Sequence, residues 1–165
     1  MDKKPKYKIK KKPLDYCISY LTFGLMIVCW MYFFFIYSSL SQRVPIHYNL
    51  LGEPDNYGDK NSIIGLLIAH TFLVIMIALL NRVPHTFNYP HPITRENYQQ
   101  HYYLATQFLR FINFGISIVF ASLFLQTIAH GLDLETLKNL PILFILILVM
   151  LFPTVWYFYK ARRIH

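Results

Sequence analysis

The sequence predicts an all-α integral membrane protein with four transmembrane helices and a structured loop between the first two. Four long stretches are almost continuously apolar, namely residues 17–40, 62–80, 111–129 and 140–159. Each has roughly the 20 residues that a helix needs to cross the hydrocarbon core. None of the four contains Asp, Glu, Lys or Arg, because the charged residues cluster between them. We therefore expect a basic tail over residues 1–15 and one membrane domain over residues 16–165.

The physical chemistry of the bilayer favours helices for these stretches. Lipid offers no hydrogen bonds, so each span has to satisfy its own backbone. A β-barrel would instead show alternating segments of about ten residues, and these stretches are continuously apolar. The first stretch also exceeds the apolar core of about 7–15 residues in a signal peptide. We expect it to remain in the mature protein.

The distribution of positive charge predicts that both termini lie in the cytoplasm. With four spans, thirteen of the sixteen Lys and Arg residues fall on the side of the termini, and only Arg43, Lys60 and Lys138 fall on the other. Cytoplasmic loops carry the excess of Lys and Arg. The Lys-rich residues 3–12 are expected to orient the chain and to contact anionic lipid headgroups. The net charge of +8 therefore does not indicate a nucleic-acid partner.

The outer loop between the first two spans, residues 41–61, is predicted to be structured. Its residues that favour turns are Pro45, Asn49, Gly52, Pro54, Asp55, Asn56 and Gly58. Such residues set the local backbone geometry, whereas a flexible linker would be rich in Gly and Ser. We expect Pro45, Gly52 and Gly58 to shape the backbone of this loop.

Three roles are open for the polar residues of the outer loop, which are His47, Glu53, Asp55, Asp59 and Lys60. In the first, they serve folding, with Asn49 and Asp55 in Asx turns. In the second, they recognise a ligand or peptide, because binding residues concentrate on structured loops. In the third, His47, Asp55 and Asp59 are weak candidates for a metal site, although their spacing matches no strong metal motif.

The second span is expected to be capped by Asn61 or Ser62. It contains His70, about eight residues from its start. A polar side chain within a span faces protein or water rather than lipid. His70 is thus the best single candidate for a functional group inside the membrane, and a hydrogen bond to a neighbouring helix is the alternative.

The loop before the third span, residues 81–97, is predicted to be non-helical because it contains Pro84, Pro90 and Pro92. Thr94 then has the position of an N-cap. From Arg95 onward the pattern is amphipathic. This segment either lies at the membrane interface or extends the third span, and both interpretations stay open.

The sequence does not indicate an activity typical of soluble enzymes. The sequence has no Walker loop, HExxH, GxSxG or CxxC motif. We expect no cofactor, and we consider an enzyme less favoured than a binding protein. In the last span, Pro153 is expected to kink the helix.

The outer loop resembles the signature of a bacterial membrane family of unknown function that also forms the N-terminus of SdpI-type immunity proteins. The pattern is roughly I-P-x-H-x-N-x-x-G-x-x-D-x-x-G-x-K. Here it stands as Val44, Pro45, His47, Asn49, Gly52, Asp55, Gly58 and Lys60. The loop before the third span is also similar, at Asn88, Tyr89, Pro90, Ile93, Thr94, Glu96, Asn97, Tyr102 and Arg110. The resemblance covers about residues 15–115 and implies a multi-pass protein of the bacterial cytoplasmic membrane.

The resemblance also implies a function in immunity or sensing. SdpI protects its bacterium from a secreted toxic peptide and holds a transcriptional repressor at the membrane. By this likeness, the outer loop would bind a secreted peptide or small ligand through His47, Asn49, Asp55 and Lys60. The secondary candidates are His70, Asn88, Tyr89, Thr94 and Asn97.

Two alternatives from other classes stay open. One is a metal-dependent membrane enzyme with His47 and Asp55 as ligands, together with His70 or Asp59. The other is a structural subunit that assembles with another membrane protein or with copies of itself.

Overall fold

A computed structural model describes residues 4–49, 51–134 and 142–164 of the chain. Its helices are α1 (Pro13–Ile36), α2 (Ser62–Leu80), α3 (Tyr98–Gly131) and α4 (Ile142–Ala161), with short 3-10 turns at Tyr37–Ser39 and Pro84–Thr86. Its strands are β1 (Arg43–Tyr48) and β2 (Pro54–Asp59). The start of the predicted fourth span, at residues 140 and 141, lies outside the described residues.

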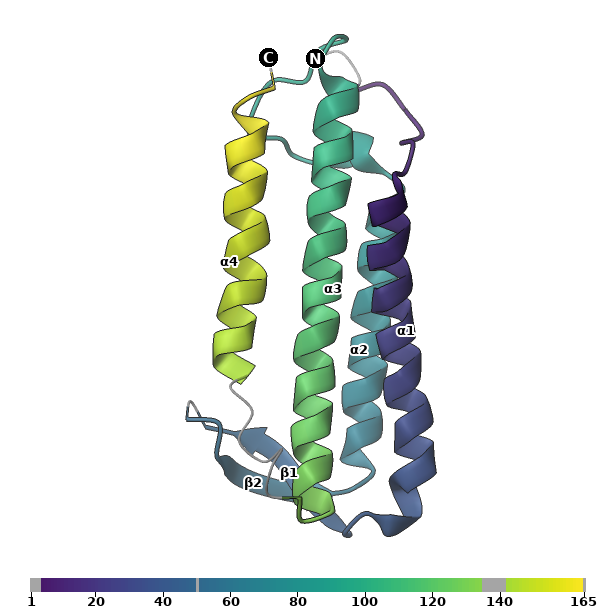
Figure 1. Ribbon diagram of the computed structural model, residues 1–165, viewed down its shortest axis with the longest axis vertical. Helices are drawn as coiled ribbons and strands as arrows, with labels where there is room; N and C mark the ends of the chain where they lie inside the picture. Colours follow the sequence, from purple (N-terminus) through teal and green to yellow (C-terminus); the bar gives the residue numbers. More distant parts are fainter. Residues whose placement is uncertain (1–3, 50, 135–141, 165) are drawn as a thin grey trace.

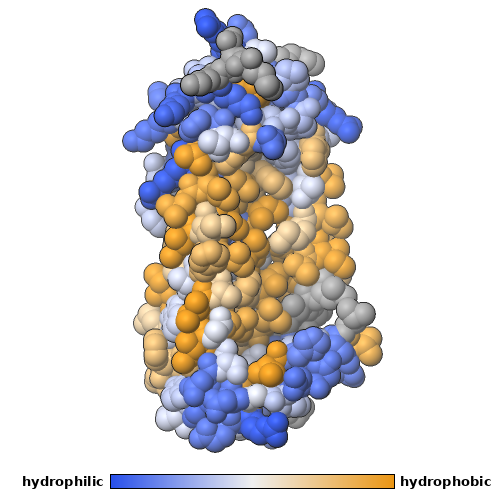
Figure 2. Space-filling model, turned by 180° about the vertical axis from the view of Figure 1, so that it is seen from behind, coloured by the Kyte–Doolittle hydropathy of each residue, from blue (hydrophilic) through white to orange (hydrophobic). Residues whose placement is uncertain are grey.

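The prediction of four spanning helices is confirmed at the level of length and composition. Within the described residues, four helices are long and apolar enough to cross a membrane. A hydrophobic band separates two hydrophilic ends of the molecule (Figure 2). The chain is thus built as a multi-pass membrane protein.

One detail of the predicted architecture is wrong, and one open alternative is decided. The fold is not all-α, because β1 and β2 form an antiparallel hairpin in the loop between α1 and α2. Helix α3 begins at Tyr98, ahead of the predicted third span at residues 111–129. The amphipathic segment is therefore a continuous extension of this helix, and the prolines before it keep the preceding loop non-helical.

The predicted helix caps differ as well. Asn61 stands at the N-cap of α2 without a capping bond from its side chain. Its own N–H donates instead to Asp59 Oδ1 at 2.8 Å. Thr94 Oγ1 accepts hydrogen bonds from the N–H groups of Glu96 and Asn97. It therefore caps a turn that precedes α3, whose own N-cap position is Asn97.

Helix α3 is the centre of the bundle and packs against α1, α2 and α4 (Figure 1). Helix α4 approaches α3 closely at Gly115, where an added Cβ would collide with the Val149 side chain. Small residues allow such approach between membrane helices, whose association depends on close packing.

Polar side chains join α1, α2 and α3 inside the bundle. Trp30 Nε1 donates to Thr71 Oγ1 at 2.9 Å, and Asn113 Nδ2 donates to the Val74 carbonyl at 3.1 Å. His70 is buried, and its Nε2 lies 2.8 Å from Ser117 Oγ. These pairs satisfy polar groups that would be costly to expose to lipid.

Candidate ligand-binding site

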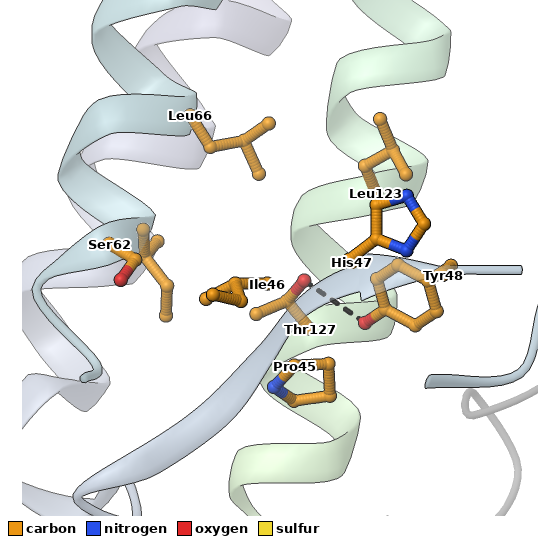
Figure 3. Close-up of a pocket in the computed structure, with 9 residues that line it drawn as sticks. Pro45, Ile46, His47, Tyr48, Ser62, Leu66, Leu123 and Thr127 are labelled. Carbon is orange, nitrogen blue, oxygen red and sulfur yellow. Dashed lines mark hydrogen bonds between the residues drawn. The ribbon is translucent and has the colours of Figure 1, made fainter. Parts of the chain in front are cut away.

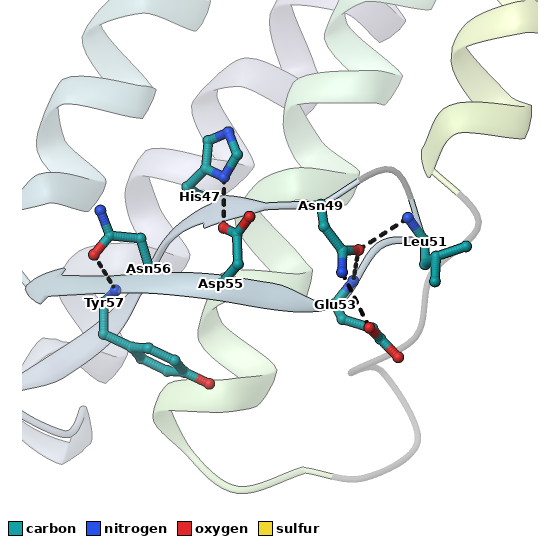
Figure 4. A network of polar contacts seen from close by, with 7 residues as sticks. All are labelled: His47, Asn49, Leu51, Glu53, Asp55, Asn56 and Tyr57. Atoms are coloured by element: carbon teal, nitrogen blue, oxygen red, sulfur yellow. Dashed lines mark hydrogen bonds and ion pairs between the residues drawn. The ribbon is translucent and has the colours of Figure 1, made fainter.

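Asn49 closes the turn of the β1–β2 hairpin (Figure 4). Its Oδ1 accepts hydrogen bonds from the N–H of Leu51 at 2.9 Å and of Glu53 at 3.0 Å. Its Nδ2 donates to Glu53 Oε2 at 3.0 Å. This is the Asx-type turn that the sequence predicted, and these bonds give the Asn49 side chain a role in shaping the loop.

At two positions of the hairpin, Gly52 and Gly58, the local geometry disfavours a residue with a side chain. Gly52 has φ of 82°, a left-handed conformation that side chains disfavour. An added Cβ at Gly58 would lie 2.9 Å from Cγ2 of Ile46 on the facing strand. Both positions agree with the predicted loop-shaping role.

His47 and Asp55 face each other across the two strands (Figure 4). His47 Nδ1 lies 2.5 Å from Asp55 Oδ1, and the two side chains are 67% and 44% exposed. The predicted Asx turn at Asp55 is not formed, because its carboxylate pairs with this imidazole instead. The pair is open to solvent and stays available to a ligand.

Lys60 occupies a different environment from His47 and Asp55. It is 8% exposed, and its Nζ donates to the Tyr37 carbonyl at 3.1 Å. The same ammonium lies 4.3 Å from the centre of the Tyr37 ring, a favourable cation–π distance. Lys60 thus ties the hairpin to the end of α1, and its ammonium is occupied by these contacts.

The candidate metal ligands His47, Asp55 and Asp59 do not form a group of three in the described residues. Across residues 4–49, 51–134 and 142–164, no three His, Cys, Asp or Glu side chains are grouped so that they could hold a metal ion. Asp59 accepts from Asn61 N–H rather than facing the pair of His47 and Asp55.

A cavity of about 410 Å³ lies between β1, α2 and α3 (Figure 3). Its lining residues are Pro45, Ile46, His47, Tyr48, Ser62, Ile63, Leu66, Leu123 and Thr127. At its edge the Tyr48 hydroxyl lies 3.1 Å from Thr127 Oγ1. Burial raises the pKa of the Tyr48 phenol above its ordinary value, so Tyr48 stays neutral. The cavity combines apolar walls with a few polar groups, which is typical of ligand sites.

Most of the cavity lining was missed by the sequence reasoning. Only Pro45 and His47 were among the predicted site residues. The alternation of Val44, Ile46 and Tyr48 is a signal for a strand and could have predicted β1. No local signal indicates that Leu123 and Thr127, far along the chain, face this strand.

The predicted secondary candidates do not join this cavity. His70 lies one helical turn beyond Leu66 on α2 and stacks on Phe120, with 5.3 Å between ring centres. Its bond to Ser117 corresponds to the structural alternative for an intramembrane His. It links helices α2 and α3.

The remaining secondary candidates lie at the opposite end of the bundle, in the loop before α3. The Tyr89 hydroxyl donates to the Pro84 carbonyl at 2.8 Å. Asn97 Oδ1 accepts a hydrogen bond from Thr94 N–H at 2.9 Å. The Asn88 side chain is exposed. Burial raises the pKa of the Tyr89 phenol. Tyr89, Thr94 and Asn97 therefore hold this loop in place.

One family profile matches the chain, a domain of unknown function (DUF1648), over residues 24–71. The match covers part of α1, the hairpin and the first half of α2, and the matched parts of the hairpin and of α2 supply most of the cavity lining. No curated protein and no solved structure matches the chain. The predicted likeness to a family of unknown function is confirmed for this segment, and the likeness to SdpI-type immunity proteins stays a prediction.

Proposed function

We propose that this chain is a multi-pass protein of a bacterial cytoplasmic membrane whose outer hairpin and cavity bind a secreted peptide. Its role would be that of an SdpI-like immunity or sensing factor. The observation that carries the proposal is the cavity beneath β1, which is open, mostly apolar and flanked by the exposed pair of His47 and Asp55.

The proposed orientation places the hairpin outside and both termini inside. The termini lie at one end of the bundle and the hairpin at the other (Figure 1). The terminal end carries most of the Lys and Arg residues, and such an excess favours the cytoplasmic side. The hairpin then faces the space from which a secreted peptide arrives.

The size and chemistry of the cavity support an apolar side chain as the bound group. Its volume of about 410 Å³ falls in the range of roughly 300–1,000 Å³ for ligand pockets. Leu66, Leu123 and Ile63 supply apolar surface, while the hydroxyls of Tyr48 and Thr127 lie at the edge. A large apolar side chain of the peptide would occupy the cavity. The polar residues next to it in the peptide would then lie near these hydroxyls.

The strand at the cavity supports a peptide backbone as the second bound feature. β1 pairs with β2 along one edge, and in the part of the chain that the structure describes no strand pairs with its other edge. Four consecutive residues of β1, from Pro45 to Tyr48, line the cavity. An extended peptide recognises a free edge of this kind by strand addition.

The charge of the hairpin favours a cationic peptide. Its exposed charged residues are the carboxylates of Glu53, Asp55 and Asp59 and the guanidinium of Arg43. Lys60 is buried against Tyr37. Complementary charge raises the rate of encounter and the specificity of binding.

The experiment is survival of a deletion strain exposed to secreted cationic peptides from its own and related strains. Wild type is compared with Leu123→Trp, which fills the cavity, and with Leu125→Trp. Leu125 is on the same helix but 37% exposed and outside the cavity, so it is a matched control. His47→Ala and Asp55→Ala test the polar pair, and all variants are first brought to equal membrane abundance.

The proposal expects protection by wild type and by Leu125→Trp, with loss of protection for Leu123→Trp. Protection by Leu123→Trp equal to that by wild type would exclude the cavity as the binding site. If deletion changes survival against no peptide, the immunity function is wrong.

A further inference from the structure

A second cavity, of about 190 Å³, lies at the other end of the bundle between α1, α2 and α3. Its lining residues are Lys11, Ser19, Thr22, Phe23, Ala78, Asn81, Arg82, Arg110 and Asn113. Three of these are cationic, and two are asparagines. This cavity is distinct from the one beneath β1.

The base of this inner cavity carries a buried cation that is only partly paired. Arg110 is 5% exposed. Its Nη1 donates to Asp15 Oδ1 at 3.3 Å and to Thr106 Oγ1 at 3.4 Å. Both bonds use Nη1, and within the described residues Nη2 and Nε of Arg110 donate to no protein group. A buried guanidinium favours further acceptors, above all a planar or tetrahedral oxyanion.

The charges around the inner cavity do not balance. Asp15 is the only acidic residue on α1, α2 and α3. Its Oδ1 is taken by Arg110, and its Oδ2 accepts from Lys12 N–H at 2.7 Å. The exposed Lys11 and Arg82 at the lining have no facing carboxylate on these helices. The cavity therefore holds an excess of positive charge that attracts an anion.

The two asparagines of the lining, Asn81 and Asn113, offer side-chain oxygens that need hydrogen-bond donors. Asn113 is 5% exposed, and its Nδ2 donates to the Val74 carbonyl, which fixes the orientation of the amide. Its Oδ1 is buried without a partner among the described residues, and the same is true of Asn81 Oδ1. A buried acceptor without a donor is costly. The occupant of the cavity should thus carry hydroxyl donors as well as negative charge.

We propose that the inner cavity binds a phosphate anion that carries hydroxyl groups. The phosphoglycerol headgroup of an anionic lipid has this chemistry, and so does free phosphate in its protonated form. Lys11, Arg82 and Arg110 hold the phosphate oxygens, and the amide oxygens of Asn81 and Asn113 accept the hydroxyls. Basic cavities between membrane helices at the cytoplasmic side are known to take anionic headgroups.

The experiment uses the full chain in nanodiscs of neutral phosphatidylcholine with added phosphatidylglycerol. Native mass spectrometry then counts the lipids that the protein retains. The double variant Lys11→Gln/Arg82→Gln removes two exposed charges of the lining. We expect it to lower retention by at least tenfold, given roughly 1 kcal/mol for each basic residue near anionic lipid.

The matched control is Arg95→Gln/Arg162→Gln, which removes the same charge from two exposed positions outside the lining. It is expected to retain phosphatidylglycerol as wild type does. Equal loss in both double variants would show attraction by surface charge alone and would overturn the proposal. Absence of any preference for phosphatidylglycerol over phosphatidylcholine, with no response to phosphate, would overturn it as well.

Two further experiments test separately the role of the hydroxyl groups and the source of the phosphate. Phosphatidylmethanol has the same charge without hydroxyls, and equal retention of it would exclude the role of Asn81 and Asn113. Inorganic phosphate, added to neutral nanodiscs at matched ionic strength, raises the unfolding temperature only if it binds the folded protein. Stabilisation by phosphate in wild type but not in Lys11→Gln/Arg82→Gln assigns the cavity to free phosphate rather than to a headgroup.

Discussion

Gln126 on α3 donates a hydrogen bond from Nε2 to the carbonyl oxygen of Gly52 at 3.0 Å. The two residues are 74 positions apart in the sequence. This bond ties the turn of the hairpin to the bundle and so helps to hold β1 beside the cavity.

Replacement of Gln126 by Leu should loosen the hairpin turn without unfolding the bundle. We expect hydrogen exchange of the amides at residues 51–53 to rise roughly fivefold, the factor for a hydrogen bond of about 1 kcal/mol. Ser122→Ala is the control, because Ser122 Oγ donates within α3, to the Ile118 carbonyl. Unchanged exchange in Gln126→Leu would show that other contacts hold the turn.

Gly52 should resist substitution because of its backbone conformation. At φ of 82°, a Cβ costs roughly 1–2 kcal/mol, so Gly52→Ala should lower the free energy of unfolding by about that amount. Asn tolerates this region better, and Gly52→Asn should therefore be less destabilising. The measurement is denaturant unfolding in mixed micelles, and equal stability of all three proteins would contradict the assigned conformation.

Gly115 should determine how closely α4 approaches α3. Gly115→Ala places a Cβ against Val149, and such overpacking costs about 1–3 kcal/mol. Val149→Ala in the same chain should recover much of the loss. Gly65→Ala is the control, since a Cβ there meets nothing within 4 Å. The same unfolding measurement applies, and a stable Gly115→Ala would mean that α4 shifts without cost.

The buried pair of Asp15 and Arg110 should behave as a coupled unit. Asp15 is 0% and Arg110 5% exposed, and removing one partner of such a pair costs about 3–5 kcal/mol because the other charge stays buried. The losses in free energy of unfolding caused by Asp15→Asn and by Arg110→Gln should together exceed the loss in the double variant. Each single loss should be more than half of the loss in the double variant. A double-mutant cycle with additive single effects would show that the pair contributes no coupling.

The sequence predicted local structure best where the surroundings or the residue type allow one backbone conformation. Apolar length predicted the helices because lipid satisfies no backbone group, and turn-forming residues predicted the structured loop between the first two spans and the Asx turn at Asn49. The sequence left two interpretations open for the first turns of α3, because these turns are amphipathic and lack the apolar signal of the span. The hairpin was missed because turn residues interrupt the alternation of its short strands.

The sequence by itself determined the four apolar helices, the asymmetry of charge between the two ends and the special backbone at Gly52. Each follows from a local property, namely hydropathy, charge or allowed φ. Only the tertiary structure decided that Leu123 and Thr127 complete the cavity beneath β1, that Lys60 is buried on Tyr37, and that Arg110 pairs with Asp15. These depend on which helix faces meet, and that choice results from packing between side chains that are distant along the chain.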